Sequence, residues 1–314
     1  MIAEHILSNT LIDAIRYFSD PDNCLKTAMA FVWPDGLTCP HCKAKDAHFI
    51  ASRRIWRCVG CKKQFSIKVG TIFADSPLGL DKWLTAIWLI ANAKDGVSSY
   101  ELHRSLGVTQ KTAWFMLHRI RLAMKTGTFR KLPGAVEADE TFIGDLEKNK
   151  HKSKKLHAGR GAVGKTTVIG LKERGGELRA FVIDNTKRET LHGEIKKQVN
   201  PGTLLVTDAF PAYRGLTPEC YHLFVDHAVK YVEGGVHTNG LENFWSLLKR
   251  TIKGTYTYCP SQHLERYLDD QVYRFNECKG NDFQRFTAAL GRIAGHSLTY
   301  EELTHGHLTL YGKA

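Results

Sequence analysis

Apolar and polar residues in the middle of the chain follow patterns that switch between strand-like and helix-like spacing. Alternating β-branched and aromatic residues predict strands, and apolar residues three and four positions apart predict helices. The predicted strands are residues 135–144, 165–173, 178–185, 202–210 and 220–227, and the predicted helices are residues 186–199 and 241–252. Gly175-Gly176 predicts a hairpin between the second and third strands.

Three strands, a helix, two strands and a helix follow one another in the order of an RNase H-like α/β core. We therefore predict a mixed five-stranded sheet with helices, in residues 131–290. In that arrangement the fourth strand lies next to the first, so that residues on both strands meet at one edge of the sheet.

A second pattern, between residues 97 and 124, has helix start and stop signals twice. Ser98 and Glu101 form a capping box, Gly107 ends that helix, and Thr109 caps a second one. Two helices joined by a short turn with a glycine predict a helix-turn-helix, although an ordinary helical hairpin in a core has the same pattern. We expect DNA contacts from the start of the second helix and from two arginines further along: Gln110, Lys111, Thr112, Trp114, Arg119 and Arg121.

Four cysteines fall into two C-x2-C pairs, Cys39 with Cys42 and Cys58 with Cys61, with fifteen residues between the pairs. This spacing predicts a structural zinc ribbon, since four thiolates fill a tetrahedral site and leave no open position for water. Four reduced thiols without a metal are the alternative. Residues 39–68 contain eight Lys and Arg and one acid, Asp46, so we expect the ribbon to contact the DNA backbone.

The overall charge agrees with a nucleic-acid partner. The 314 residues include 44 Lys and Arg against 32 Asp and Glu, which gives a net charge of +12 and a pI of about 9.3. A polyanion is the expected partner of such a chain. Because we find no secretory signal and no apolar run long enough to span a bilayer, we expect a cytoplasmic protein without a membrane partner.

Residues 159–166 match the phosphate-loop pattern G-x-x-x-x-G-K-[ST]. The segment before them is too polar for a buried strand and the segment after them is β-branched, so we expect no nucleotide cofactor. The basic loop 148–165 has seven Lys and Arg and no acid, which predicts a DNA-contacting arm that uses Lys152, Lys154 and Lys155. A solvated surface loop is the alternative.

Acids occupy three special places in the predicted core. Asp139 is on the first strand, Asp208 ends the fourth and Glu242 is in the late helix. Carboxylates that converge in this way hold two divalent ions for phosphoryl transfer. Lys249 stands seven residues after Glu242, two turns along the same helix face, where its ammonium could hold a DNA phosphate.

Several motifs together resemble one family of enzymes. They are WPDGLTCPHC, RRIWRCVGCKKQFSIKVGTIF, ELHRSLGVTQKTAWFMLHRIR, VEADETFIG, VTDAFPAY, HTNGLENFWSLLKR and YLDDQVYRFN, over roughly residues 20 to 280. In this order they resemble insertion-sequence transposases of the IS1595 family, the ISXO2-like group with a D-D-E-type catalytic domain. The resemblance implies Asp139 and Asp208 as metal ligands and Lys249 as the downstream basic residue. Its third position is either Glu242 or Asn239, and we favour Glu242 because it alone stands seven residues before Lys249.

This resemblance implies a DNA transposase. It would bind the ends of its insertion sequence, cleave them by two-metal-ion catalysis with Mg2+ or Mn2+, and transfer the 3′-hydroxyl ends into target DNA, as a homodimer or higher oligomer on DNA. An RNase H-fold nuclease without strand transfer and a non-catalytic zinc-ribbon and helix-turn-helix regulator are the alternatives. Around the catalytic domain we expect N-terminal helices and a four-cysteine zinc ribbon in residues 1–75, a helix-turn-helix segment in residues 76–130, and a C-terminal tail in residues 291–314.

Overall fold

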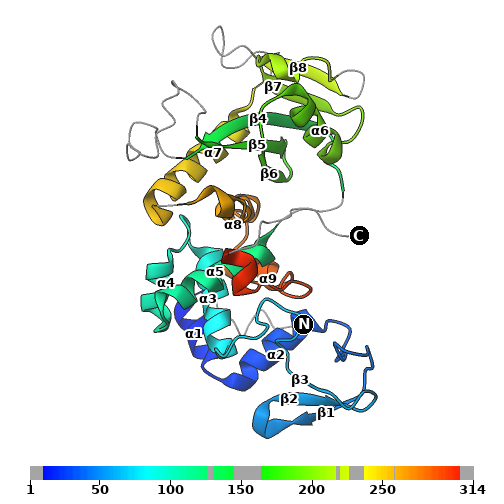
Figure 1. Cartoon of the computed structure of the whole chain (residues 1–314), viewed down its shortest axis with the longest axis vertical. Helices are drawn as coiled ribbons and strands as arrows, with labels where there is room; N and C mark the ends of the chain where they lie inside the picture. The colour runs from blue at the N-terminus through cyan, green and yellow to red at the C-terminus, as the bar shows by residue number, and fades with distance from the viewer. Residues whose placement is uncertain are drawn as a thin grey trace. The chain divides into compact units, whose positions relative to one another are not determined.

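The computed structural model describes residues 10–125, 130–144, 164–216, 220–225, 237–257 and 259–304. The chain divides into two compact units, one formed by residues 1–125 and 277–314 and the other by residues 126–276 (Figure 1). Within the described residues, no helix is both long enough and apolar enough to cross a membrane.

The first unit is a helical body with a small sheet. Its central helix is α3 (Leu80–Asn92), which is apolar on most sides and buries Trp83 and Trp88 almost completely. Phe286 packs on Trp88, with ring centroids 5.0 Å apart, and also on Phe18 at 5.6 Å. The other helices of this unit are α1 (Leu11–Phe18), α2 (Pro21–Val32), α4 (Ser99–Leu106), α5 (Gln110–Met124), α9 (Asp282–Leu290) and α10 (Tyr300–Thr304).

The position of α9 differs from the predicted domain boundary. We assigned residues up to 290 to the catalytic domain, but the second compact unit ends at residue 276. The reason is long-range packing, because Phe286 of α9 completes the core around Trp88. Residues 277–290 therefore belong to the same unit as the N-terminal helices.

The small sheet of the first unit has three antiparallel strands in the order β1-β2-β3. These are β1 (Ala47–Ile50), β2 (Ile55–Cys58) and β3 (Gln64–Phe65), and a short 3-10 turn, η1 (Ala51–Arg53), joins the first two. Trp56 pairs with Phe65 across the sheet and is buried, with the ring of Trp33 5.0 Å from it at nearly a right angle. Aromatic packing on one face thus gives this small sheet a core.

Two of the predicted helix caps are present. The Ser98 side chain accepts a hydrogen bond from Glu101 N at the start of α4, and Gly107 ends α4 with a φ of 60°. Thr109 then accepts from Thr112 N at the start of α5. The two helices and the glycine turn between them therefore lie where the sequence pattern predicts them.

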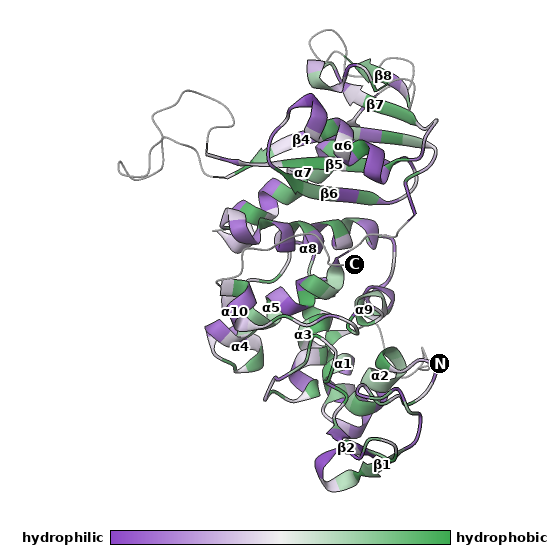
Figure 2. Ribbon diagram, turned by 45° about the vertical axis from the view of Figure 1, so that its right-hand side comes forward, coloured by the Kyte–Doolittle hydropathy of each residue, from purple (hydrophilic) through white to green (hydrophobic). Residues whose placement is uncertain are grey.

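The second unit is built on a mixed five-stranded sheet with strand order β6-β5-β4-β7-β8. The central strand β4 runs antiparallel to β5 and parallel to β7, so the predicted adjacency of the first and fourth strands is confirmed. The middle of strand β5, next to β4, contains hydrophobic residues, which are green in Figure 2. The strands are β4 (Ala135–Ile143), β5 (Thr166–Glu173), β6 (Leu178–Ile183), β7 (Leu204–Asp208) and β8 (Tyr221–Val225).

Helices cover this sheet and give it two cores. Leu191 and Ile195 of α6 (Arg188–Gln198) pack with Val136 and Ala138 of β4. A second cluster contains Ile143 of β4 together with apolar residues of α7 (Asn239–Thr251) and α8 (Leu264–Asn276). Because side chains alternate across a strand, β4 contributes its even-numbered residues to the first cluster and its odd-numbered face to the second.

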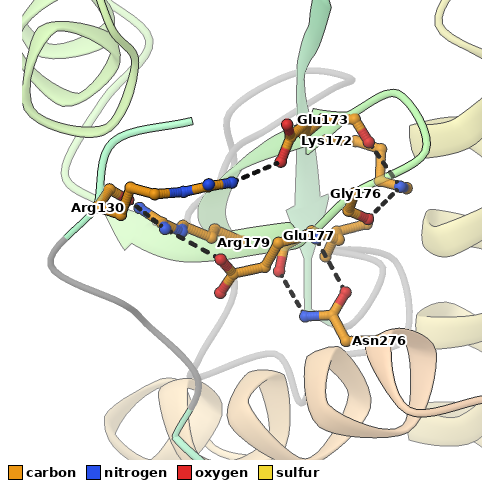
Figure 3. A network of polar contacts seen from close by, with 8 residues as sticks. Arg130, Lys172, Glu173, Gly176, Glu177, Arg179 and Asn276 are labelled. Atoms are coloured by element: carbon orange, nitrogen blue, oxygen red, sulfur yellow. Dashed lines mark hydrogen bonds and ion pairs between the residues drawn. The ribbon is translucent and has the colours of Figure 1, made fainter. Parts of the chain in front are cut away.

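Polar contacts fix the β5–β6 hairpin to the end of α8 (Figure 3). The side-chain amide of Asn276 accepts from the N–H of Leu178 and donates to its carbonyl, both at 2.9 Å. Arg179, which is buried, forms an ion pair with Glu177 at 3.0 Å. Asn276 is the last residue of α8. Its side-chain amide makes the two backbone hydrogen bonds at Leu178 that a neighbouring strand would otherwise make.

Candidate active site and metal centre

The alignment of β4 with β7 brings two acids onto the same face of the sheet. Glu137 is the partner of Val206 in the parallel ladder, and Asp139 and Asp208 each stand two residues further along their strands. Since side chains return to the same face every second residue, both acids project from the face that α7 covers. Asp208 is also the last residue of β7.

Asp139 receives one hydrogen bond on each carboxylate oxygen. Trp245 Nε1 of α7 donates to Oδ2 at 2.9 Å, and the Glu140 backbone N–H donates to Oδ1 at 2.9 Å. Burial raises the pKa of Asp139 to about 6; the Trp245 hydrogen bond opposes this rise, and the negative charges of Asp208 and Glu242 add to it. The charges of Asp208 and Glu242 therefore both act on Asp139.

Glu140 lies on the opposite face of the sheet from Asp139. Its Oε2 accepts a hydrogen bond of 2.6 Å from the hydroxyl of Tyr213, a buried residue of the short turn η4 (Pro211–Tyr213) that follows β7. Burial is the main cause that raises the pKa of Glu140 to about 7. At the start of the same connection, Asp208 Oδ1 accepts from Phe210 N at 3.0 Å. These contacts fix the segment after β7 against β4.

Glu137 connects β4 to the first turn of α7. Its buried carboxylate accepts from Arg174 Nε and from the backbone N–H of Leu241, both at 3.3 Å. Gly240 makes this approach possible, because a Cβ there would lie 2.7 Å from Glu137 Oε2. A carboxylate near a helix N-terminus also interacts favourably with the positive end of the helix dipole. Glu137 thus sets where α7 starts relative to the sheet.

Helix α7 has three notable residues on one side. Glu242, Trp245 and Lys249 are spaced three and four residues apart, so they follow one another along the helix surface. Glu242 and Lys249 are exposed, whereas Trp245 is 5% exposed. Asn239 is exposed at the first position of α7, one turn before Glu242.

The sequence-based prediction did not include Glu137 and Trp245 in this site. Glu137 stands in the same predicted strand as Asp139, two residues before it, which places both acids on one face. Trp245 stands three residues after Glu242 in the predicted helix. Spacing could have suggested both residues, but their partners Arg174 and Asp139 are distant in the sequence.

The four cysteines form a compact cluster. In the described part of the chain they are the one group of three or more Cys, His, Asp or Glu residues whose ligand atoms all lie within 4.8 Å of one another. Cys39 Sγ lies 3.8 Å from Cys61 Sγ, and Cys42 Sγ lies 3.4 Å from Cys58 Sγ. A tetrahedral zinc with four bonds of about 2.3 Å requires sulfur separations of about 3.8 Å. The cluster therefore fits a structural zinc ion.

The backbone around the cysteines is built as two matching turns. Lys43 N donates to Cys39 O, and Lys62 N donates to Cys58 O. Lys43 and Lys62 both adopt left-handed conformations, with φ of 62° and 58°. Each C-x2-C pair thus bends in the same way and directs two sulfurs toward the centre of the cluster.

The predicted DNA-contacting residues of α5 divide into two groups. Lys111 is exposed in the first turn, with Nζ 4.4 Å from the centre of the Tyr300 ring, and Gln110 donates to Ser99 Oγ at 2.8 Å. Thr112 lies beside them and shares a hydrogen bond with the capping Thr109. These residues lie at the start of the second helix of the motif, as predicted.

The prediction that Arg119 and Arg121 contact DNA is wrong. Both are buried, at 5% and 1% exposure. The Arg119 guanidinium donates to the carbonyls of Leu298, Ile72 and Ala74, so it joins three backbone segments within the helical unit. Neither arginine is available to a DNA phosphate.

The phosphate-loop match falls at the end of the basic loop. Lys152, Lys154 and Lys155 of that loop lie outside the described residues. Thr166, the last residue of the match, is the first residue of strand β5. A phosphate loop leads into a helix whose N-terminus faces the phosphates. The match therefore lacks the structural context of a nucleotide site.

Two parts of the chain match models of known domains. Residues 131–276 match an ISXO2-like transposase domain, and residues 19–64 match a transposase zinc-ribbon domain. A protein of Halobacterium salinarum, described as an uncharacterized protein in transposable element ISH50, is 26% identical over 233 residues, which are 69% of this chain and 78% of that protein. An uncharacterized transposase-like protein of Haemophilus influenzae is 32% identical over 101 residues, which are 32% of this chain and 81% of that protein.

Proposed function

Because the chain belongs to the ISXO2-like transposases of the IS1595 family, we propose that it cleaves the ends of its own insertion sequence and joins them to target DNA. The reaction is a metal-dependent phosphoryl transfer in two stages. The first stage frees a 3′-hydroxyl at each end of the element, and in the second stage that hydroxyl attacks a phosphodiester of the target in line.

The main support is the alignment of two acids on neighbouring strands. Asp139 on β4 and Asp208 at the end of β7 stand at equivalent positions after a paired residue of the parallel ladder. The charges of Asp208 and of Glu242 on α7 both raise the pKa of Asp139, so both acids lie near enough to Asp139 for their charges to act on it, although the ligand oxygens of the three do not all lie within 4.8 Å of one another. Oxygen ligands of this kind suit Mg2+ and Mn2+.

Each residue has a separate role in this proposal. Asp139, Asp208 and Glu242 hold two divalent cations through their carboxylate oxygens. When bound, the cations supply Lewis-acid stabilisation of the attacking and leaving oxygens. Lys249, exposed two turns after Glu242, binds a DNA phosphate through its ammonium group.

Glu242 is the preferred third ligand over Asn239. Both residues are exposed near the start of α7, but only Glu242 has a charge, and that charge acts on Asp139. A carboxylate also offsets the charge of a divalent cation, which an amide does not.

DNA binding is assigned to three parts of the chain. The first turn of α5, with Gln110, Lys111 and Thr112, enters a groove, and the basic residues of the ribbon contact phosphates. The basic loop 148–165 contributes Lys152, Lys154 and Lys155 on grounds of charge alone. Two element ends are joined in one assembly, so we propose at least a homodimer on DNA.

The test is cleavage and strand transfer on a labelled duplex that contains the element's ends, with Mg2+ or Mn2+. Wild type is compared with Asp208→Asn and Glu242→Gln, which keep the side-chain shape and remove the charge. We expect the wild type to cut and join, and both variants to bind DNA without cutting it.

The other outcomes identify the alternatives. Cutting without joined products would support a nuclease, and DNA binding without metal-dependent cutting would support a regulator. If Glu242→Gln stays active while Asn239→Ala does not, the third ligand is Asn239.

A further inference from the structure

We propose that Trp245 is a positioning residue for Asp139, and that Gly170 is a glycine because the indole must lie against the sheet at that point. The inference rests on the proposed function, in which Asp139 holds a divalent cation. It concerns how the carboxylate is oriented before the cation binds.

The indole is fixed by its surroundings. Trp245 is 5% exposed and packs in the core cluster of α7 and α8, beside Leu241 and Leu248. The Phe244 ring lies 5.0 Å from it, centroid to centroid. Since a packed aromatic ring has one orientation, its N–H bond points in one direction, toward Asp139 Oδ2.

Gly170 provides the space for this arrangement. It is the direct cross-strand partner of Asp139 in the β4–β5 ladder. A Cβ at Gly170 would lie 2.6 Å from Trp245 Cζ2 and 2.7 Å from Leu241 Cδ2, both impossible contacts. The φ of Gly170 is not positive, so its backbone conformation does not require glycine. Close approach of the indole explains the residue instead.

Two donors together define the plane of the Asp139 carboxylate. Glu140 N–H binds Oδ1 and Trp245 Nε1–H binds Oδ2, each at 2.9 Å. A carboxylate oxygen can accept more than one partner, so both oxygens keep a lone pair for a cation. The orientation of these lone pairs is then set by the protein before any cation arrives.

The neutral character of the indole separates Asp139 from its neighbour Glu137. Glu137, on the same face of β4, is bound by the guanidinium of Arg174 at 3.3 Å. A cationic partner neutralises a carboxylate and competes with a metal ion for it. Trp245 donates a hydrogen bond without adding positive charge, so Asp139 keeps its full charge for the cation.

The first measurement is Mn2+ binding to the full-length protein without DNA, by calorimetry. Trp245→Phe keeps an aromatic ring in the core and removes the donor, and Gly170→Ala displaces the indole. We expect both variants to bind Mn2+ about tenfold more weakly, as is usual when a partner of a metal ligand is lost. Val272→Ala, which removes packing from the same core cluster far along α8, is the matched control and should bind Mn2+ as wild type does.

The second measurement detects the contact itself. The chain has six tryptophans, and the indole 15N–1H signal missing in Trp245→Phe identifies Trp245. Asp139→Ala should shift that signal and leave the other five in place. An unshifted Trp245 signal would show that the hydrogen bond is not formed in solution.

Cleavage assays separate this inference from the proposed function. In a wild type that cuts DNA, Trp245→Phe should need about tenfold more metal for half-maximal cutting and recover most of its rate at saturating metal. Equal metal requirements in the two proteins would overturn the positioning role alone. A wild type that neither binds Mn2+ nor cuts would contradict the proposed function, and the positioning role would fail with it.

Discussion

Arg174, directly after β5, and Glu137, near the start of β4, form an ion pair of 3.3 Å, with the Glu137 side chain only 3% exposed. The same arginine donates to the carbonyl of His237, just before α7, at 2.9 Å. Glu137 in turn accepts from Leu241 N within α7. Two side chains thus attach the start of α7 to the sheet, and this helix contains Glu242 and Lys249.

Replacing Glu137 tests this attachment. Glu137→Ala leaves Arg174 and the Leu241 N–H without their carboxylate, so we expect a loss of about 2 kcal/mol in the free energy of unfolding. Denaturant titration measures it. Lys197→Ala removes an exposed ion pair of the same unit and should cost less than about 0.5 kcal/mol. Equal effects of the two substitutions would mean that Glu137 has no special role.

Asp139 and Glu140, two half-buried carboxyl groups of β4, predict a pH dependence of the metal-free protein. The pKa values of Asp139 and Glu140 rise from 3.8 and 4.5 to about 6 and about 7, mainly through burial. A raised carboxyl pKa stabilises the fold at low pH, and that contribution is lost as the pH rises toward 7. With EDTA present, Asp139→Asn and Glu140→Gln should therefore stabilise the protein more at pH 7.5 than at pH 5. Thermal melts at both pH values measure this, and identical shifts at the two pH values would contradict it.

Metal analysis tests the cysteine cluster. We expect about one zinc per chain, lost in Cys58→Ser together with the aromatic packing of Trp56 against Trp33. Tryptophan fluorescence after chelation reports on the second effect. Cys278→Ser, an exposed cysteine outside the cluster, should keep its zinc. A wild type purified without zinc, and unaffected by chelators, would show that the thiols are not metal ligands.

Lys111 provides the test of the helix-turn-helix. It is exposed in the first turn of α5, so Lys111→Ala should weaken DNA binding and reduce the slope of log K against log salt by about one. Binding titrations at several salt concentrations measure the slope. Lys196→Ala, in α6 of the other unit, is the control for an unspecific loss of charge. An unchanged slope for Lys111→Ala would favour a helical hairpin without a DNA contact.

The order of elements in the second unit was predictable because each one has a local signal. Alternation along residues 135–144 and 202–210 and the hairpin at Gly175-Gly176 depend on neighbouring residues only. The same holds for the two C-x2-C turns and for Ser98 and Thr109 as caps. Local signals also predicted the strands that contain Asp139 and Asp208, and the order of an RNase H-like core predicted that these two strands pair.

Long-range packing was not predictable in this way. Arg119 reads as a surface arginine on an amphipathic helix, yet carbonyls of residues 72, 74 and 298 surround it. The carbonyl of residue 298 lies in a segment far along the chain. The roles of Trp245 and Gly170 likewise depend on the register of β4 with β5, which no local pattern contains.

The packing of α9 on α3 has a consequence for how the chain can be divided. The unit of residues 126–276 is continuous in sequence, whereas the helical unit is formed from both sides of it, so the sheet unit is an insertion within the helical one. A fragment that ends at residue 125 lacks Phe286 and leaves the rings of Trp88 and Phe18 uncovered. No single cut in the chain therefore separates two intact halves, because the core of the helical unit needs residues from both sides of the insertion.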